Sequence, residues 1–161
     1  MAKYELETLK NDYPDWYPYT QTLQEDRPVH VNFEELQGKT IVEIHGMEVD
    51  NDIVFFVCDD GTVYKMYHEQ DCCEAVDIND ICGEVDFLLN TPITLAEKVT
   101  ETGEVDHGDT CTWTFYNFGT VKGYVTLRWY GESNGYYSEE VDFVRCPKTV
   151  SEAIKHYRGV K

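Results

Sequence analysis

The sequence contains little positive charge. Its 161 residues include 13 Lys and Arg against 31 Asp and Glu, which gives a formal charge of −18 at pH 7. Because proteins hold phosphate groups mainly through clustered Lys and Arg, direct binding to nucleic acid or to an anionic membrane is disfavoured. The same negative field would attract a positively charged protein and speed the encounter at low salt. The alternative is that the acidity only keeps a small protein soluble.

Long apolar runs and an export signal are also lacking. No run of about 18 apolar residues is present, and the chain does not begin with a basic segment followed by an apolar block. We therefore expect a soluble, cytoplasmic protein without a membrane partner.

The chain lacks the common signatures of catalysis. It has no glycine-rich phosphate-binding motif and no serine, histidine and aspartate arranged as in a hydrolase triad. We therefore expect a protein that is not an enzyme and that uses no cofactor.

Six cysteines are present, and without an export signal they are expected to be reduced thiols. Cys72 and Cys73 are adjacent, so strain disfavours a disulfide between them. Thiolate and imidazole ligands suit zinc, which makes His68, Cys72, Cys73 and Cys82 a weak alternative metal site, although their spacing matches no recognised zinc motif.

A thiol enzyme is the catalytic alternative at the same cysteines. Cys72 or Cys73 would be the nucleophile, His68 would activate it, and Asp71 or Glu74 would orient the imidazole. Dense carboxylates raise the pKa of a thiol, because the thiolate would lie in a negative field. Packed thiols are therefore the favoured interpretation.

The segment from Ile53 to Glu74 gives the clearest hairpin signal. Between Ile53 and Cys58 both alternating faces are apolar, which predicts a central strand covered on both sides. Asp59, Asp60 and Gly61 predict a tight turn, and residues 62–68 predict the returning strand. With a strand at 39–49, this predicts an antiparallel three-stranded meander.

Further strands are predicted in the second half of the chain. Residues 92–100 look extended, and apolar residues alternate at 111–116 and at 121–130. Ser133, Asn134 and Gly135 are typical of a hairpin turn, so we expect residues 136–144 to return along the preceding strand.

Two helices are expected. After the cysteines, apolar side chains recur at helical spacing, and they are Ile78, Ile81, Cys82, Val85, Leu88 and Leu89. Near the C-terminus, Thr149 and Glu152 form a capping box. The predicted fold class is α+β, with a twisted, mainly antiparallel sheet of about six or seven strands, one helix after the cysteine cluster and one C-terminal helix.

Three regions are predicted along the chain. Residues 1–37 read as an aromatic N-terminal arm, which would pack on its own domain or on a second copy and form a homodimer. Residues 38–146 form a single α+β domain. Residues 147–161 form the C-terminal helix packed on that domain.

Three strings carry a resemblance to known proteins: HEQDCCEAV at 68–76, WTFY at 113–116 and KGYVTLRWYGESNGYYS at 122–138. They resemble an uncharacterised family of small proteins encoded largely by bacteriophages and prophages, over about residues 38–144. The resemblance implies a phage accessory protein in a bacterial host cell, and it carries over no catalytic residue.

The leading hypothesis is a non-enzymatic phage accessory protein that binds and inhibits a host protein, either a defence enzyme or a nucleic-acid enzyme. The partner would present a basic surface to an acidic face that imitates a row of phosphates. The predicted contact residues of that face are Glu69, Asp71, Glu74, Asp77, Asp80, Glu84 and Asp86.

Arg128 is the centre of the alternative, a site that sequesters a nucleotide-like signal. Arg128, Trp129, Tyr130, Asn134 and Tyr136 could hold a planar or phosphorylated ligand by stacking and bidentate contacts. Otherwise these aromatic side chains pack on the fold and Arg128 pairs with a carboxylate.

Overall fold

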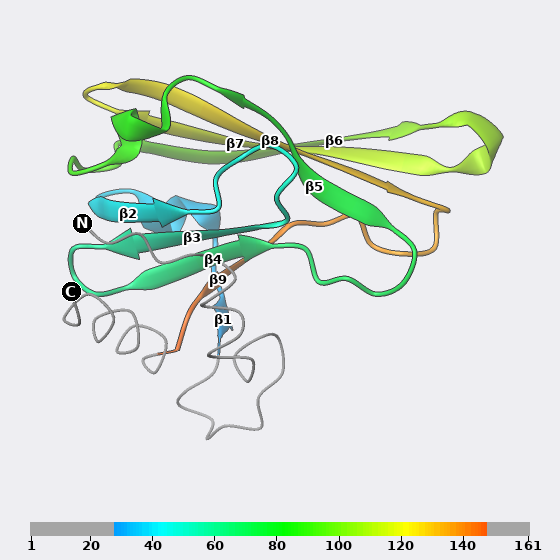
Figure 1. Cartoon of the computed structure of the whole chain (residues 1–161), viewed down its shortest axis with the longest axis horizontal. Helices are drawn as coiled ribbons and strands as arrows, with labels where there is room; N and C mark the ends of the chain where they lie inside the picture. The colour runs from blue at the N-terminus through cyan, green and yellow to red at the C-terminus, as the bar shows by residue number, and fades with distance from the viewer. Residues whose placement is uncertain (1–27, 148–161) are drawn as a thin grey trace.

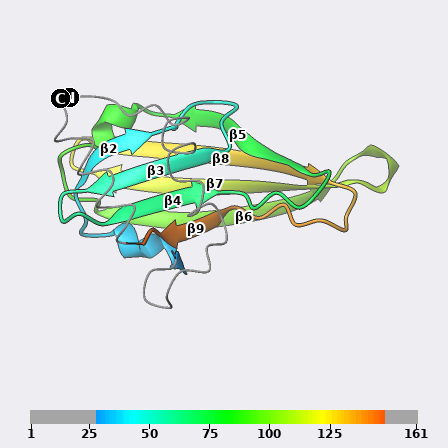
Figure 2. The same ribbon diagram turned by 60° about the horizontal axis from the view of Figure 1, so that its bottom comes forward.

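The computed structural model describes residues 28–147, which form two antiparallel sheets packed face to face (Figures 1 and 2). The strands are β1 (Val29–His30), β2 (Ile41–His45), β3 (Ile53–Cys58), β4 (Val63–Tyr67), β5 (Ala75–Cys82), β6 (Leu95–Glu104), β7 (Thr110–Thr120), β8 (Gly123–Ser133) and β9 (Asp142–Arg145). The short 3-10 helices are η2 (Phe33–Leu36), η3 (Val85–Leu88) and η4 (Asp106–Gly108). Among the described residues, no helix is long and apolar enough to cross a membrane.

The order of the strands defines the two layers. The five-stranded sheet runs β1-β9-β4-β3-β2, and the four-stranded sheet runs β5-β8-β7-β6. Every pairing between these strands is antiparallel. The last strand, β9, pairs with β4 on one side and with β1 on the other, so the chain returns to its first sheet after completing the second.

The main core lies between the two sheets. Trp129 of β8 is fully buried there, and its indole N–H donates to the sulfur of Met66 at 3.2 Å. Phe33 of η2 packs edge-on against Tyr116 and Phe118, with ring centroids 4.8 and 5.0 Å apart. Residues 28–37, which the sequence assigned to the arm, therefore contribute Phe33 and Leu36 to the core.

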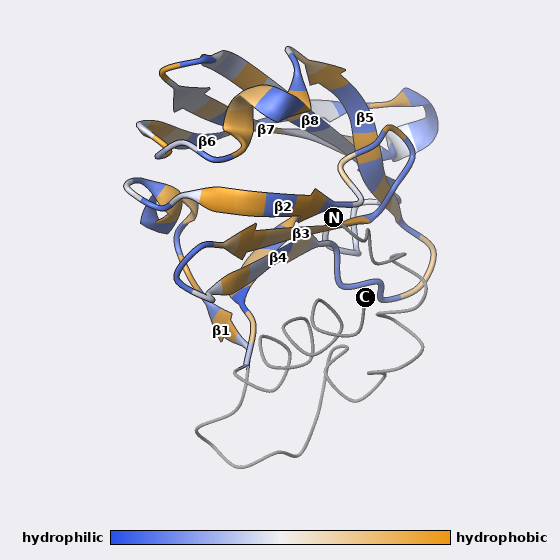
Figure 3. Cartoon of the chain, turned by 60° about the vertical axis from the view of Figure 1, so that its left-hand side comes forward, coloured by the Kyte–Doolittle hydropathy of each residue, from blue (hydrophilic) through white to orange (hydrophobic). Residues whose placement is uncertain are grey.

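The central hairpin is confirmed. All six residues of β3 are buried, and β3 pairs with β2 and with β4 to form the predicted meander. Val54, Phe56 and Cys58 face the main core, whereas Ile53, Phe55 and Val57 belong to a second apolar cluster on the other side of the sheet. In Figure 3 the ribbon of β3 is accordingly among the most hydrophobic of the molecule.

The α+β fold class was wrong, because the described part of the chain is nearly all β and contains no α-helix. The helix predicted between residues 78 and 89 is instead β5 followed by η3. A bulge between Ile78 and Asp80 inserts one residue into β5, so that Ile78 and Ile81 both face inward. This three-residue spacing imitates a helical repeat. The predicted C-terminal helix, residues 147–161, lies almost wholly outside the described residues.

The hairpin predicted at Ser133, Asn134 and Gly135 was also wrong. The turn exists, since Gly135 has φ +90° and its N–H donates to the Ser133 hydroxyl at 3.1 Å. The chain after it does not pair with β8, because it crosses to the other sheet and forms β9. The strand that pairs with β8 along its whole length is β7.

Candidate functional site

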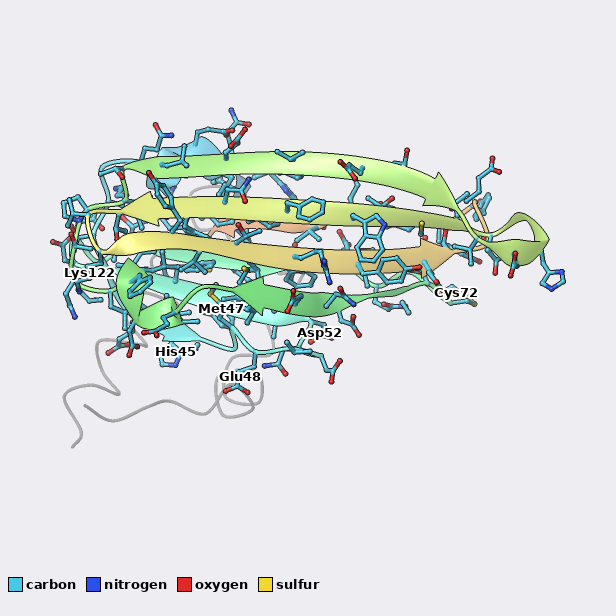
Figure 4. All side chains as sticks on the ribbon, turned by 90° about the horizontal axis from the view of Figure 1, so that it is seen from above. His45, Met47, Glu48, Asp52, Cys72 and Lys122 are labelled. Atoms are coloured by element: carbon cyan, nitrogen blue, oxygen red, sulfur yellow. A yellow bond between two sulfur atoms is a disulfide. The ribbon has the colours of Figure 1, made fainter. Side chains whose placement is uncertain are left out.

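The outward-facing side of the four-stranded sheet carries a row of large side chains, which Figure 4 views face-on. Residues paired across antiparallel strands point to the same side of a sheet, so the register fixes which side chains are neighbours. One row across β6, β7, β8 and β5 consists of Glu101, Trp113, Tyr130 and Asp77. The next row consists of Val99, Phe115, Arg128 and Asp80. We call Val99, Trp113, Phe115, Arg128 and Tyr130 the outer aromatic face.

The rings of this face contact one another. The centroids of Trp113 and Tyr130 are 4.3 Å apart, with planes tilted by 44°. The Arg128 guanidinium lies 5.2 Å from the centre of the Trp113 ring, within the range of a cation–π contact. Val99 is 38% exposed and the three rings are partly exposed, so solvent reaches an apolar surface here.

Arg128 is held by its own chain. Its Nε–H donates to Asn79 Oδ1 at 2.8 Å, and its Nη2 lies 3.7 Å from Asp80 Oδ2. The bulge of β5 explains this arrangement, because it sets both Asn79 and Asp80 beside the single position of Arg128. The guanidinium therefore already has a carboxylate, an amide and a ring as partners.

The five residues of the predicted ligand site are not gathered in one place. Trp129 faces the core and is fully buried, whereas Arg128 and Tyr130 face outward on the same strand. Asn134 and Tyr136 lie beyond the end of β8, and Tyr136 is 83% exposed. Sequence reasoning missed Trp113, whose alternation with Phe115 was visible but whose position beside Arg128 depends on the β7–β8 register.

The six Lys and Arg side chains within residues 28–147 all have an intramolecular partner. They are Lys39 with Asp60, Lys65 with the Tyr67 ring, Lys98 with the Tyr116 ring, Lys122 with the Leu89 carbonyl, Arg128 with Asn79 and Asp80, and Arg145 with Glu35. The same residues include 24 Asp and Glu, so their formal charge is −18, equal to that of the whole chain. The excess negative charge therefore belongs to the sandwich.

Most residues of the predicted acidic face lie on β5 or beside it in the chain. Six of its seven carboxylates lie on β5 or on the segments that flank it, and we call these six the acidic edge: Glu69, Asp71, Asp77, Asp80, Glu84 and Asp86. Partial burial and the nearby charges of Asp50 and Asp52 raise the pKa of Asp77. Glu97 and Glu101 lie on β6 at the opposite side of the sheet, so carboxylates border the outer aromatic face on both sides.

Glu74, the seventh predicted contact residue, points into the protein. Its side chain has no exposed surface and accepts the N–H groups of Asp71 at 2.6 Å and Cys72 at 3.0 Å. His68 Nε2 lies 2.9 Å from the same carboxylate, and His68 Nδ1 lies 2.6 Å from the Glu140 carbonyl. Burial raises the pKa of Glu74, but these hydrogen bonds outweigh it and lower the pKa to about 2. His68 and Glu74 thus hold the 68–74 loop together.

Contrary to expectation, Cys72 and Cys73 are joined by a disulfide in the exposed 68–74 loop (Figure 4). Cys82 is an exposed free thiol at the end of β5, while Cys58, Cys111 and Cys146 are buried free thiols. The proposed zinc ligands are therefore not gathered, and no group of three or more His, Cys, Asp or Glu within the described part of the chain could hold a metal ion. The candidate nucleophiles are bonded to each other, and both ring nitrogens of His68 face protein oxygens.

A half-open depression of about 440 Å³ lies beside this loop. It is lined by His68, Glu69, Gln70, Asp71, Ser138, Glu140 and Asp142. Partial burial raises the pKa of Asp142. The carboxylates around the depression would favour a cationic side chain of a partner over an anionic ligand.

A family model described as a domain of unknown function, DUF7448, matches residues 34–143, which extend from η2 to β9. No curated protein and no solved structure matches the chain.

Proposed function

The chain belongs to the DUF7448 family, and because the function of that domain is unknown, we propose from its own surface that it is a non-enzymatic protein-binding module. Its partner would be a protein with a basic surface. The contact would be centred on the outer aromatic face and bordered by the acidic edge.

The observation that carries this proposal is the arrangement of Trp113, Tyr130 and Arg128 on an open sheet face. Trp, Tyr and Arg are the residues that most often dominate binding energy at protein interfaces, usually near the centre and inside a polar rim. Here the rim is formed by carboxylates of β5 and β6. Such a rim accelerates association with a basic partner and opposes association with an acidic one.

The resemblance of the strings at 68–76, 113–116 and 122–138 to phage-encoded proteins supports a finer version of the proposal. In that version the protein is a phage accessory protein, and its partner is a host defence enzyme or nucleic-acid enzyme that is inhibited when its basic surface is covered. The charge of the sandwich supports this choice, because a nucleic-acid enzyme presents Lys and Arg to its substrate.

Affinity capture from a bacterial lysate with the tagged full-length chain tests the proposal. We expect a partner that is retained at 50 mM NaCl and lost at about 500 mM, since screening shortens the range of the electrostatic attraction. W113A should reduce retention by about tenfold or more, as expected for a central aromatic residue. Y136A is the matched control, because Tyr136 is an exposed aromatic residue outside the outer aromatic face.

A second pair of variants tests the acidic edge. The double variant E84Q/D86N removes two charges from the acidic edge, and E34Q/D59N removes two exposed charges elsewhere. We expect only the first pair to weaken retention at low salt. Equal retention by wild type, W113A and E84Q/D86N would contradict the proposed function.

A further inference from the structure

Three of the four sheet edges are closed or short within residues 28–147. β1 has only two residues, and β2 has a bulge between Ile41 and Glu43 as well as bridges from residues 40 and 41 to the segment before β6. β5 is covered by the turn after β2, because the Asp50 N–H donates to the Ile78 carbonyl at 2.8 Å and the Ile78 N–H donates to the Asn51 carbonyl at 2.9 Å. Such features commonly prevent a further strand from adding to an edge.

The edge at β6 has none of these features. Its ten residues pair with β7 in one continuous register, from Leu95 opposite Gly119 to Glu104 opposite Thr110, without a bulge. The segment around η2 lies beside the first part of this strand, where the Gln37 amide donates to the Ala96 carbonyl at 3.4 Å and Lys98 lines a depression together with Phe33 and Glu34. From Glu97 to Glu104 every side chain is exposed. In the described part of the chain, β7 is the only strand that pairs with this stretch.

The position of the β6–β7 hairpin leaves this edge accessible. The hairpin extends beyond the end of the five-stranded sheet (Figure 1). The exposed Thr100, Thr102 and Glu104 show that the inward side of this stretch is not covered either. An added strand would therefore find room for side chains on both of its faces.

The side chains of β6 indicate which strand would fit. Glu97, Val99 and Glu101 alternate on the outward side, next to Asn117, Phe115 and Trp113 of β7. Side chains opposite one another on paired strands interact, and opposite charges there are favourable. The complementary strand carries Lys or Arg opposite Glu97 and Glu101, and an apolar residue opposite Val99.

We propose that the edge of β6 from Glu97 to Glu104 binds an extended basic segment of a partner protein, which adds to the four-stranded sheet as a fifth strand. The added strand would carry a basic residue at its first and fifth positions and an apolar residue at its third, with any residue at the second and fourth. This proposal rests on the proposed function and specifies the partner's chemistry, since backbone hydrogen bonds supply affinity and alternate side chains supply specificity. It also extends the outer aromatic face by one strand.

A second copy of this chain fits the same edge less well. Antiparallel pairing of two β6 strands centred on Val99 would set Glu97 of each copy opposite Glu101 of the other, and like charges in that position are destabilising. The formal charge of −18 adds repulsion between whole copies. A basic strand from a different protein avoids both the contacts between like charges and the repulsion between two acidic copies.

A fluorescent peptide of sequence KTVTKTK tests the edge directly against the full-length protein by fluorescence anisotropy. Two further versions carry N-methyl groups on alternate residues, one on the odd and one on the even positions. Both keep the charges and side chains, but each removes the N–H donors of one edge of the peptide. We expect one version to lose at least about tenfold in affinity and the other to bind like the parent, because only one edge of the added strand pairs with β6.

The protein side is tested with E97Q/E101Q. The charge-matched control is E48Q/D59N, which changes two exposed carboxylates in the β2–β3 and β3–β4 turns. We expect the first to weaken peptide binding by about three- to tenfold at low salt, and the second by less than about twofold. Amide hydrogen exchange should slow at residues 97–104 when the peptide binds.

Two results would overturn the strand-docking proposal. The first is equal binding of all three peptides, which would mean attraction by charge alone. The second is a dimer in sedimentation experiments with exchange protection at 97–104 in the absence of peptide, which would assign the edge to a second copy. The two proposals can also fail separately. If a captured partner is lost with W113A but retained by E97Q/E101Q, the proposed function stands and docking at the β6 edge is rejected. If the peptide binds at the β6 edge but no partner is captured from the lysate, docking at the edge stands and the proposed function is rejected.

Discussion

Glu74 shows how one buried carboxylate organises a surface loop. It lies three residues after Asp71, and its two oxygens accept two backbone N–H groups and face the imidazole of His68. An ionised carboxylate is acceptor-only, so it satisfies several donors at once. The conformation of the loop that carries the Cys72–Cys73 disulfide therefore depends on the charge of Glu74.

We expect E74Q to lower the free energy of unfolding by about 1–3 kcal/mol at pH 7, because the Gln amide nitrogen would face N–H donors that the carboxylate now accepts. D71N is the control and should change the free energy of unfolding by less than about 0.5 kcal/mol, since the Asp71 side chain is exposed and only its backbone N–H reaches Glu74. Urea denaturation of the three proteins measures both differences.

The lowered pKa of Glu74 predicts how the difference in free energy of unfolding between wild type and E74Q changes with pH. The pKa of Glu74 is about 2 in the folded protein and 4.5 in its ordinary state, so the unfolded chain takes up the proton first as the pH falls. The stabilisation is fully present above pH 4.5 and is lost as the pH falls through 2. The difference between wild type and E74Q should therefore shrink from pH 5 to pH 2, and a constant difference would contradict this role.

At the scale of elements, the bulge in β5 decides the chemistry of the outer aromatic face. Without the extra residue, only one side chain of β5 would lie beside Arg128. With it, Asn79 and Asp80 both reach the guanidinium and hold it next to Trp113. The bulge thus fixes Arg128, the only Arg of this sheet, within the outer aromatic face.

The connection after β5 depends on close approach of two backbones. Gly83 has φ +97°, and a Cβ atom there would lie 2.4 Å from the Tyr124 carbonyl oxygen. Gly38 has a similar φ of +86°, but a Cβ atom there would meet nothing within 4 Å. An alanine at Gly38 therefore tests the cost of the positive φ alone, whereas an alanine at Gly83 adds the clash with the Tyr124 carbonyl.

We expect G38A to lower the free energy of unfolding by about 1 kcal/mol, the conformational penalty alone, and G83A to lower it by about 3 kcal/mol or more. Chemical denaturation of both variants gives the comparison. Equal losses would show that the chain after β5 moves away from β8 without cost, and would contradict the close packing of this connection.

At the scale of the whole molecule, the charge distribution opposes folding. The described residues contain few ion pairs between Lys or Arg and a carboxylate, namely Lys39–Asp60, Arg128–Asp80 and Arg145–Glu35. These pairs are partly exposed and contribute little each. Repulsion among the remaining carboxylates is the larger electrostatic effect at neutral pH.

Salt should therefore stabilise this protein. We expect the melting temperature to rise by about 2–5 °C between 20 and 300 mM NaCl at pH 7, because screening reduces the repulsion between carboxylates. Differential scanning fluorimetry measures the shift. A melting temperature that falls with NaCl would mean that attractive ion pairs outweigh the repulsion.

The sequence by itself determined the features that depend on neighbouring residues. The apolar run from Ile53 to Cys58 and the turn at Gly61 specify the β3–β4 hairpin, because alternation and turn conformation are local properties. Composition alone fixes the surplus of carboxylates, and the acids at residues 69–86 follow β5 and its flanking segments because they belong to one continuous stretch of the chain.

Only the tertiary structure decided the rest. The apolar spacing of residues 78–89 suits a helix as well as a bulged strand, and pairing with β8 selects the strand. The chain bends at Gly135, yet the strand after the bend joins the other sheet and forms no hairpin with β8. Trp113 meets Arg128 through the register of β7 and β8, and β6 is left as an edge because no later strand within residues 28–147 pairs with it. Contacts between residues far apart in the chain set all of these outcomes, and the local pattern of residues does not encode which distant segment will be the neighbour.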